Sequence, residues 1–347
     1  MKKLSISICL FFFVVFALVS PGPAQEKRYN LRLFAGGEGS MTYASMSGLV
    51  NIIRKHNPKI WGDIVCYPAK GTYAGYRAIE KGEGEGTYAS VPQMIELWTN
   101  TGPLAKNPVP PNRKALLGLS LWDHANFLST RTDRNDINSL KDLEGKTVAA
   151  ATPGSTTDTL AQQIHAAFGI KSTFKYMQTT ANADALRSGM LDAVWAYVLS
   201  EVGLPSFLKD LELRMEVKIV PLSEKEVAAV AEKTPGVAAL LVTPANFTTR
   251  MKGPEKTWVP GLGQFWVLSP DLPEDAAYEM CEALYVHRKE VTEVYNGHWK
   301  FEKDPFGMQA LHLDVAARAK LPLHPGTAKW LKKHNVWKDR WNGMLAK

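Results

Sequence analysis

Cysteine is scarce in this sequence, with three in 347 residues. No pair shows the C-x-x-C spacing and none is paired with histidine at the spacing of a zinc ligand set, which excludes a disulfide-rich scaffold and a cysteine-based metal site. Cys9 lies in an N-terminal apolar run, so only Cys66 and Cys281 belong to the rest of the chain. These two thiols either pair in an oxidising compartment or stay free and buried, and the sequence leaves both outcomes open.

Recognisable catalytic motifs are also missing. The chain has no G-x-S-x-G elbow, H-E-x-x-H helix, Walker loop or G-x-G-x-x-G fingerprint, and the glycines of Gly82–Gly86 have the wrong spacing for a phosphate loop. No two of its eight histidines are four residues apart, so none is nominated as a base or a metal ligand. We therefore expect a protein that is not an enzyme and that uses no cofactor or metal. An exported enzyme is the distant alternative.

Apolar runs of membrane-spanning length, about 20 residues, are absent after the first two dozen positions. At the N-terminus, Lys2 and Lys3 precede an apolar run from Ile6 to Val19, and the small residues of Gly22-Pro23-Ala24 follow at the spacing of a cleavage site. This pattern predicts a cleaved signal peptide over residues 1–24, with a retained membrane anchor as the alternative. The mature protein is then expected in the periplasm or elsewhere outside the cytoplasm.

Dense charge runs are lacking as well. Removing Lys2 and Lys3 lowers the formal net charge from +7 to +5, and the excess is spread thinly along the chain, so nucleic-acid binding is not indicated. A mild positive field favours anionic solutes, although simple solubility explains the charge better.

What the chain does contain is an alternation of β-type and helical patterns in two series, typical of parallel sheets covered by helices. The length suits about two domains. The expected strands are Leu31–Phe34, Ile64–Tyr67, Thr147–Ala151, Thr173–Met177, Ala193–Val198 and Lys218–Pro221. The expected helices are Met41–Lys55, Tyr73–Lys81, Thr157–Phe168, Asn182–Ser188 and Glu274–His287.

Two extended segments, Leu116–Thr130 and Val259–Leu268, are placed to carry the chain between the two units and back. The mostly helical tail would then pack on the first unit. We predict an α/β fold with lobe I at residues 25–122 plus 270–347 and lobe II at 123–269, the boundaries holding within about ten residues. Two crossings make a hinge on which the lobes can close.

Two glycine- and hydroxyl-rich loops follow strands and open helices, one in each predicted lobe. Gly36–Ser40 precedes the first helix, and Thr152–Thr157 opens the helix that contains Leu160 and Ile164. Ligands of open α/β sheets bind beyond the carboxyl ends of strands, where a helix start offers unpaired N–H groups and partial positive charge. Either loop alone is an ordinary turn, but the two together predict an anion clamp.

A third turn, Ala69–Tyr73, follows the strand Ile64–Tyr67 and could add an amide or a hydroxyl to the site. Aromatic side chains near these loops could enclose the carbon skeleton of a ligand: Tyr43, Tyr73, Trp195 and Tyr197. For Trp195 and Tyr197, core packing is as good an explanation as ligand contact.

Several ordered motifs resemble the TAXI subfamily of TRAP-transporter solute receptors, over nearly all of the mature chain. Gly36–Ser40 with Tyr43 is similar to the first glycine loop of that family, and Pro153–Thr157 is similar to its "PGSGT" motif. Further matching segments are Leu140–Val148 ("DLkGKrV"), Ala185–Ala193 ("ALkdGxiDA"), Val202–Pro205 ("gGxP") and Leu323–Ala328 ("lHPGA").

The resemblance implies a two-lobed periplasmic-binding-protein type II fold and delivery of a carboxylate-bearing solute, an organic acid or amino acid, to a TRAP-type membrane permease. The alternative is the same fold serving as a binding protein for another transporter class or for a sensor system. A monomer is expected. Where family members often show "GGSxEN" and a later glutamine, this chain has Lys70–Gly75 and Ser90, so the usual ligand cannot be assumed. The expected ligand contacts are Gly39, Ser40, Tyr43, Gly71, Thr72, Tyr73, Ser90, Gly154, Ser155, Thr156, Thr157, Trp195 and Tyr197.

Overall fold

The computed structural model describes residues 28–346, apart from residues 39, 152 and 178–180. The predicted signal peptide lies outside the described residues, as does Gly39 of the first glycine loop. In the part of the chain that is described, no helix combines the length and the apolar character needed to cross a membrane.

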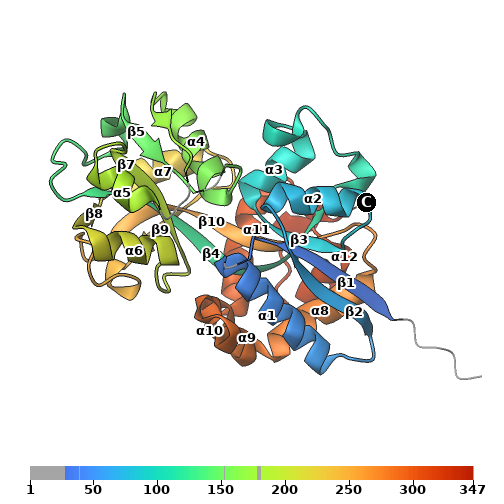
Figure 1. Ribbon diagram of the computed structural model, residues 1–347. Coiled ribbons are helices and arrows are strands. Elements are labelled where there is room, and N and C mark those ends of the chain that lie inside the picture. Colours follow the sequence, from blue (N-terminus) through green and yellow to red (C-terminus); the bar gives the residue numbers. More distant parts are fainter. Residues whose placement is uncertain (1–27, 39, 152, 178–180, 347) are drawn as a thin grey trace, which may run out of the picture.

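Two α/β lobes lie side by side and are joined by two long strands (Figure 1). The joining strands, β4 (Leu116–Arg131) and β10 (Thr257–Leu268), pair antiparallel with each other. Each contributes one half to either lobe, which makes a single continuous sheet of the whole molecule. The predicted α/β fold, with two lobes and two crossing strands, is confirmed. The exact lobe boundaries, near residues 122 and 269, stay predictions.

In the first lobe the strand order is β2-β1-β3, all parallel, followed by the antiparallel strands β10 and β4. These strands are β1 (Tyr29–Ala35), β2 (Trp61–Pro68) and β3 (Gly86–Ser90). Helices cover both faces because alternate side chains of the sheet are apolar and need burial. The covering helices are α1 (Met41–His56), α2 (Thr72–Glu80), α3 (Val91–Thr99), α8 (Glu274–Val286), α9 (Arg288–Val294), α10 (Trp299–Lys303), α11 (Pro305–Arg318) and α12 (Pro325–Lys333).

The second lobe repeats this plan with the order β6-β5-β7-β4. Its strands are β5 (Thr147–Ala149), β6 (Thr173–Phe174), β7 (Ala193–Leu199), β8 (Val217–Ile219) and β9 (Ala238–Val242). Its helices are α4 (Thr156–Phe168), α5 (Asn182–Arg187), α6 (Ser206–Arg214) and α7 (Glu224–Lys233). One apolar core lies on each side of this sheet, whereas the first lobe has one large core. The pattern analysis did not anticipate β3, β9, α3, α6 or α7.

The two cysteines are not bonded to each other. Cys66 lies half-buried on β2, and Cys281 is buried in α8 with its thiol beside the Thr327 hydroxyl. Burial raises the pKa of Cys281 to about 12, so its thiol stays protonated and unreactive. Of the two outcomes left open by the sequence, the structure shows free thiols.

Candidate functional site

A cavity of about 600 Å³ lies between the lobes, and it receives residues from both lobes and from both crossing strands. We call it the interlobe cavity. It is bordered by the loop after β1, the turn before α2 and the loop before α4, which all follow the carboxyl ends of strands. This is the position expected for a ligand site in an open α/β sheet.

Six of the predicted contact residues line the interlobe cavity: Ser40, Gly71, Ser155, Thr156, Thr157 and Tyr197. The structure therefore brings the two glycine- and hydroxyl-rich loops to one space, although they are more than a hundred residues apart in the chain. Six others are not among its lining residues: Tyr43, Thr72, Tyr73, Ser90, Gly154 and Trp195.

The two helix starts that face the interlobe cavity are capped in the same way. The Ser40 hydroxyl accepts a hydrogen bond from the Tyr43 amide at the start of α1, at 3.1 Å. The Ser155 hydroxyl accepts from the Asp158 amide at the start of α4, at 3.3 Å. A serine cap satisfies only one of the first N–H groups of a helix, so the remaining first-turn donors are available to a ligand.

The α4 start differs from the prediction at one residue, Asp158, which the sequence analysis did not single out. Its Oδ2 accepts the Gly154 amide at 2.8 Å, and its Oδ1 accepts from the Tyr176 hydroxyl and the Gln162 amide, both at 2.9 Å. The Gly154 N–H is therefore already used inside the protein. A carboxylate at this helix start also offsets part of its positive potential, so the α4 turn binds anions less strongly than its loop motif alone indicates.

Trp195 and Tyr197 lie on the same strand, β7, but have different surroundings. Trp195 is 1 % exposed and packs in a core of the second lobe, where its Nε1 donates to His165 Nε2 at 3.1 Å. Tyr197 is nearer the end of the strand, lines the interlobe cavity and stacks on His124 with ring centroids 4.7 Å apart. Core packing is thus the correct interpretation for Trp195.

Thr72, Tyr73 and Ser90 lie just behind the cavity wall. Thr72 and Ser90 direct their hydroxyls at Gln93 of α3, and the Tyr73 hydroxyl donates to Glu96 of the same helix. Burial and the neighbouring Glu96 carboxylate raise the pKa of Tyr73. These residues support the site from within the first lobe.

Gln93 links the two lobes through a chain of hydrogen bonds whose direction can be worked out. Its Oε1 accepts the Ser90 backbone N–H at 3.1 Å, which identifies that atom as the oxygen. The Thr156 hydroxyl, 3.2 Å away across the lobe boundary, must then donate to Oε1. Having donated its proton, the Thr156 oxygen accepts from Gln264 Nε2 at 3.0 Å.

This series of hydrogen bonds determines the orientation of the Gln264 amide in the interlobe cavity. With Nε2 turned toward Thr156, the Gln264 Oε1 is left buried and has no hydrogen-bond partner among the described residues. A buried acceptor without a partner costs free energy, and a ligand donor that reaches this oxygen would offset that cost.

His124 belongs to the same hydrogen-bond network. Gln264 Nε2 lies 3.5 Å from its Nδ1, and its Nε2 is 3.0 Å from the Thr157 hydroxyl. If Nδ1 faces a donor, Nε2 carries the proton and donates to Thr157, whose own proton is then free for a ligand. Burial lowers the pKa of His124 to about 3, so the ring is neutral near pH 7. The sequence analysis nominated no histidine here because a single His in a long apolar strand has no distinguishing pattern.

Two oppositely charged side chains line the described part of the interlobe cavity, Glu38 and Lys70. Both are exposed at its mouth. Aromatic and apolar side chains make up much of the remaining wall, among them Tyr88, Trp122 and Phe207. The arrangement can hold a small polar molecule with a nonpolar body by hydrogen bonds and by the two opposite charges.

A buried Ser–His–Asp relay lies beside the cavity but is not suited to catalysis. The Ser120 hydroxyl contacts His312 Nδ1, and His312 Nε2 is 2.7 Å from Asp123 Oδ1. Ser120 is 0 % exposed and does not line the interlobe cavity, and its hydroxyl also lies 3.2 Å from the Gln264 carbonyl. A nucleophile must reach its substrate, so we interpret this relay as a structural link between β4, β10 and α11.

Comparisons with known proteins agree with this architecture. The fold is similar to that of a Xanthomonas citri protein solved with ATP bound, at 11 % identity and a TM-score of 0.50, covering 84 % of this chain and 98 % of that one. It is also similar to a putative L-cystine ABC transporter protein from Listeria monocytogenes, at 14 % identity and a TM-score of 0.45, covering 78 % and 95 %. A third similar structure is the GluR0 ligand-binding core from Nostoc punctiforme in complex with L-glutamate, at 15 % identity and a TM-score of 0.45, covering 78 % and 99 %. Identities this low bear on the fold alone.

The model of one protein family matches residues 33–334, which include both lobes and both crossing strands. The chain therefore belongs to the NMT1-like family.

Proposed function

We propose that the protein is an extracytoplasmic solute-binding receptor that captures a small carboxylate-bearing solute between its lobes and delivers it to a membrane transporter. The observation that carries this proposal is the interlobe cavity, bordered by two serine-capped helix starts and backed by two crossing strands. Lobes joined by two strands can open and close on a solute by small changes in a few backbone angles.

Among carboxylate-bearing solutes, the polar groups of the cavity favour an amino acid over a dicarboxylate. Lys70 and the α1 start can hold the carboxylate, while Glu38 attracts a positive group and the unpaired Gln264 Oε1 can accept from an N–H donor. A dicarboxylate would place negative charge near Glu38 and leave the Gln264 oxygen unsatisfied. The aromatic wall, with Trp122, Tyr197 and Phe207, suits a bulky side chain.

The transporter partner has two candidate classes. The motif resemblance implies a TRAP-type permease of the TAXI kind, whereas the similar Listeria monocytogenes protein is named for an ABC transporter. The genes that neighbour this one separate the two. A multi-spanning TRAP permease gene supports the first class, and a permease gene next to an ATPase gene supports the second.

The solute proposal is tested with the purified mature protein. A thermal-shift screen against amino acids and organic acids should find a solute that raises the melting temperature, because a ligand that binds only the folded form stabilises it. Calorimetry with that solute should then show that Ser40→Ala and Thr157→Ala each weaken binding, by on the order of 1–3 kcal/mol where the partner group is charged.

The matched control is Thr99→Ala, which removes an exposed hydroxyl of α3 outside the cavity and should leave the affinity unchanged. Wild-type affinity in both Ser40→Ala and Thr157→Ala would remove the site assignment.

A further inference from the structure

Three side chains that the solute site does not use meet where the end of α1 packs against the junction of α8 and α9. His56 is the last residue of α1, His287 stands between α8 and α9, and Glu290 lies in the first turn of α9. One nitrogen of each ring and one carboxylate oxygen all lie within 4.8 Å of one another. The side chains are 21 %, 29 % and 31 % exposed, so an ion from solution can reach them.

Two of the three donor separations bracket the value expected around a tetrahedral metal ion. Glu290 Oε1 is 2.8 Å from His56 Nε2 and 3.6 Å from His287 Nδ1. Zinc bonds of about 2.0–2.1 Å place neighbouring tetrahedral ligand atoms roughly 3.3–3.4 Å apart, between these two values. The Glu290 oxygen is therefore close to the zinc-ligand spacing from each imidazole nitrogen.

The two imidazole rings are stacked, with centroids 3.3 Å apart and an interplanar angle of 10°. For both lone pairs to meet at one ion, the rings must turn about their Cβ–Cγ bonds. That torsion is broad for histidine, so the turn costs little.

We propose that His56, His287 and Glu290 form a binding site for a divalent transition-metal ion, with zinc as the best match to two imidazoles and one carboxylate. Three protein ligands leave a fourth position for water or another donor. Lys55 is the competing cation, with its Nζ 2.9 Å from Glu290 Oε2. Its side chain is 64 % exposed and can move into solvent, because an exposed ion pair contributes little stability.

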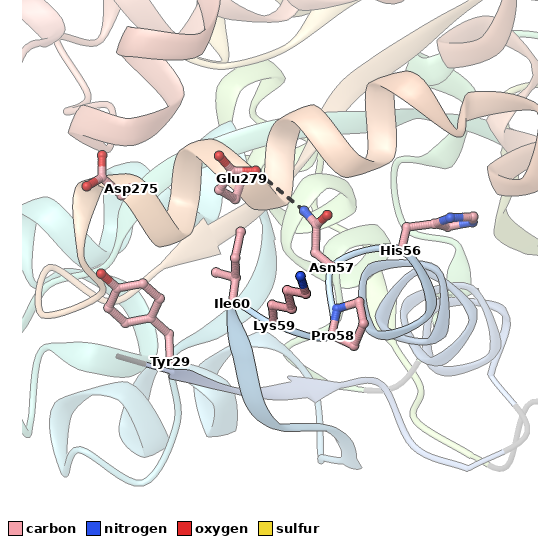
Figure 2. Close-up of a pocket in the computed structure, with 8 residues that line it drawn as sticks. All are labelled: Tyr29, His56, Asn57, Pro58, Lys59, Ile60, Asp275 and Glu279. Atoms are coloured by element: carbon pink, nitrogen blue, oxygen red, sulfur yellow. Dashed lines mark hydrogen bonds between the residues drawn. The ribbon is translucent and has the colours of Figure 1, made fainter. Parts of the chain in front are cut away.

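The site borders a surface groove of about 730 Å³ lined by Tyr29, His56, Asn57, Pro58, Lys59, Ile60, Asp275 and Glu279 (Figure 2). Figure 2 shows the His56 ring pointing away from the centre of this groove, whereas Asn57 turns toward Glu279 of α8. His56 is thus directed at the His287–Glu290 pair. An ion bound there would connect α1 to helices more than 200 residues later in the chain, and would stabilise the first lobe.

The test uses the purified mature protein after treatment with a chelator, with zinc chloride as the probe. Calorimetry should show one zinc ion bound per chain at micromolar concentration or below, and the melting temperature should rise with zinc. His56→Asn and His287→Asn should each weaken zinc binding by more than the roughly 10–100-fold that loss of an outer-shell partner costs. Lys55→Met should strengthen it, because a competing positive charge is removed.

The matched control is His334→Asn. His334 also contacts a carboxylate, Glu282 at 2.8 Å, with Lys333 nearby, but it has no second histidine. This variant should bind zinc like the wild type. Cobalt substitution adds a readout that does not depend on stability, since tetrahedral cobalt absorbs visible light strongly. Absence of zinc binding in the wild type, or equal binding in His56→Asn, His287→Asn and His334→Asn, would overturn the proposal.

Discussion

At the scale of single residues, the most informative group is the Gln264 amide. One backbone N–H, that of Ser90, determines which Gln93 atom is oxygen, and the direction of each following hydrogen bond depends on that choice. The result is a buried acceptor, Gln264 Oε1, beside the solute site. This oxygen has no hydrogen-bond partner among the described residues. Such an atom discriminates between ligands, because a ligand without a donor leaves its desolvation cost uncompensated.

This argument predicts the effect of Gln264→Met, which keeps the length of the side chain but removes the acceptor. Affinity for a solute with an ammonium or amide donor should fall by on the order of 1–3 kcal/mol. Calorimetry with the solute from the thermal-shift screen measures this. Thr99→Ala, which alters an exposed hydroxyl of α3 outside the interlobe cavity, should bind the solute normally. Equal affinities for the two variants would show that Gln264 Oε1 does not contact the solute.

At the scale of helices and strands, the most distinctive local sequence features lie at the helix ends. Serine caps begin α1 and α4, in the two loops that the sequence analysis identified as rich in glycine and hydroxyl groups. The end of α11 is less regular: Lys320 adopts the left-handed conformation with φ of 52°, and the Leu321 amide donates to the Ala316 carbonyl at 3.3 Å. This geometry is the Schellman motif, in which glycine normally occupies the left-handed position.

Lys320→Gly should therefore stabilise the protein, by up to about 1 kcal/mol, because glycine adopts positive φ without the clash of a Cβ atom. Urea unfolding monitored by circular dichroism measures the change. Asn100→Gly is the matched comparison at the end of α3, where φ is also 52°. The Asn100 side chain bonds both the amide and the carbonyl of Val109, so this substitution should destabilise. A loss of stability in Lys320→Gly would contradict the explanation.

At the scale of the whole molecule, β4 and β10 decide how the two lobes meet. Besides these strands, polar contacts between the lobes include the Thr156–Gln93 hydrogen bond, a bond from Trp299 Nε1 to the Ser200 carbonyl at 2.7 Å, and the Lys300–Glu201 ion pair at 3.4 Å. Opening the interlobe cavity requires these contacts to break while the two crossing strands continue to join the lobes.

Burial of histidines should make global stability sensitive to mild acid. Burial lowers the pKa of His124 to about 3, and of His165, His298 and His324 to about 4, from an ordinary value of 6.5. Between those values and 6.5 the unfolded chain binds more protons than the folded chain. The free energy of unfolding should consequently fall as pH drops from 6.5 toward 4, by about 1.4 kcal/mol per pH unit for each histidine.

Urea unfolding at several pH values tests this dependence. In His298→Asn the slope should be shallower by about one histidine's share, roughly 1.4 kcal/mol per pH unit, whatever the stability of the variant at pH 7. An unchanged slope would mean that His298 is not the buried neutral group that the structure shows.

Much of the site was predictable wherever the signal is local. Gly36–Ser40 and Pro153–Thr157 were identified as strand-to-helix turns, since serine and glycine have distinct roles at the start of a helix. Trp122, His124 and Gln264 gave no such signal. They lie in β4 and β10, which are buried along almost their whole length. A residue of these strands lines the cavity only if it lies where the strand passes between the two lobes. Asp158 was missed because an acidic residue in a first helical turn is ordinary.

The sequence by itself determined the two α/β units, the two crossing segments and the two glycine- and hydroxyl-rich loops that open helices, because periodicity and turn chemistry act between residues close together in the chain. Only the tertiary structure decided that Trp195 belongs to a core, that Gln264 retains an unpaired oxygen, and that His56 meets His287 and Glu290. Those outcomes depend on contacts between segments far apart in the chain, and such contacts are set by how apolar surfaces of whole elements pack together.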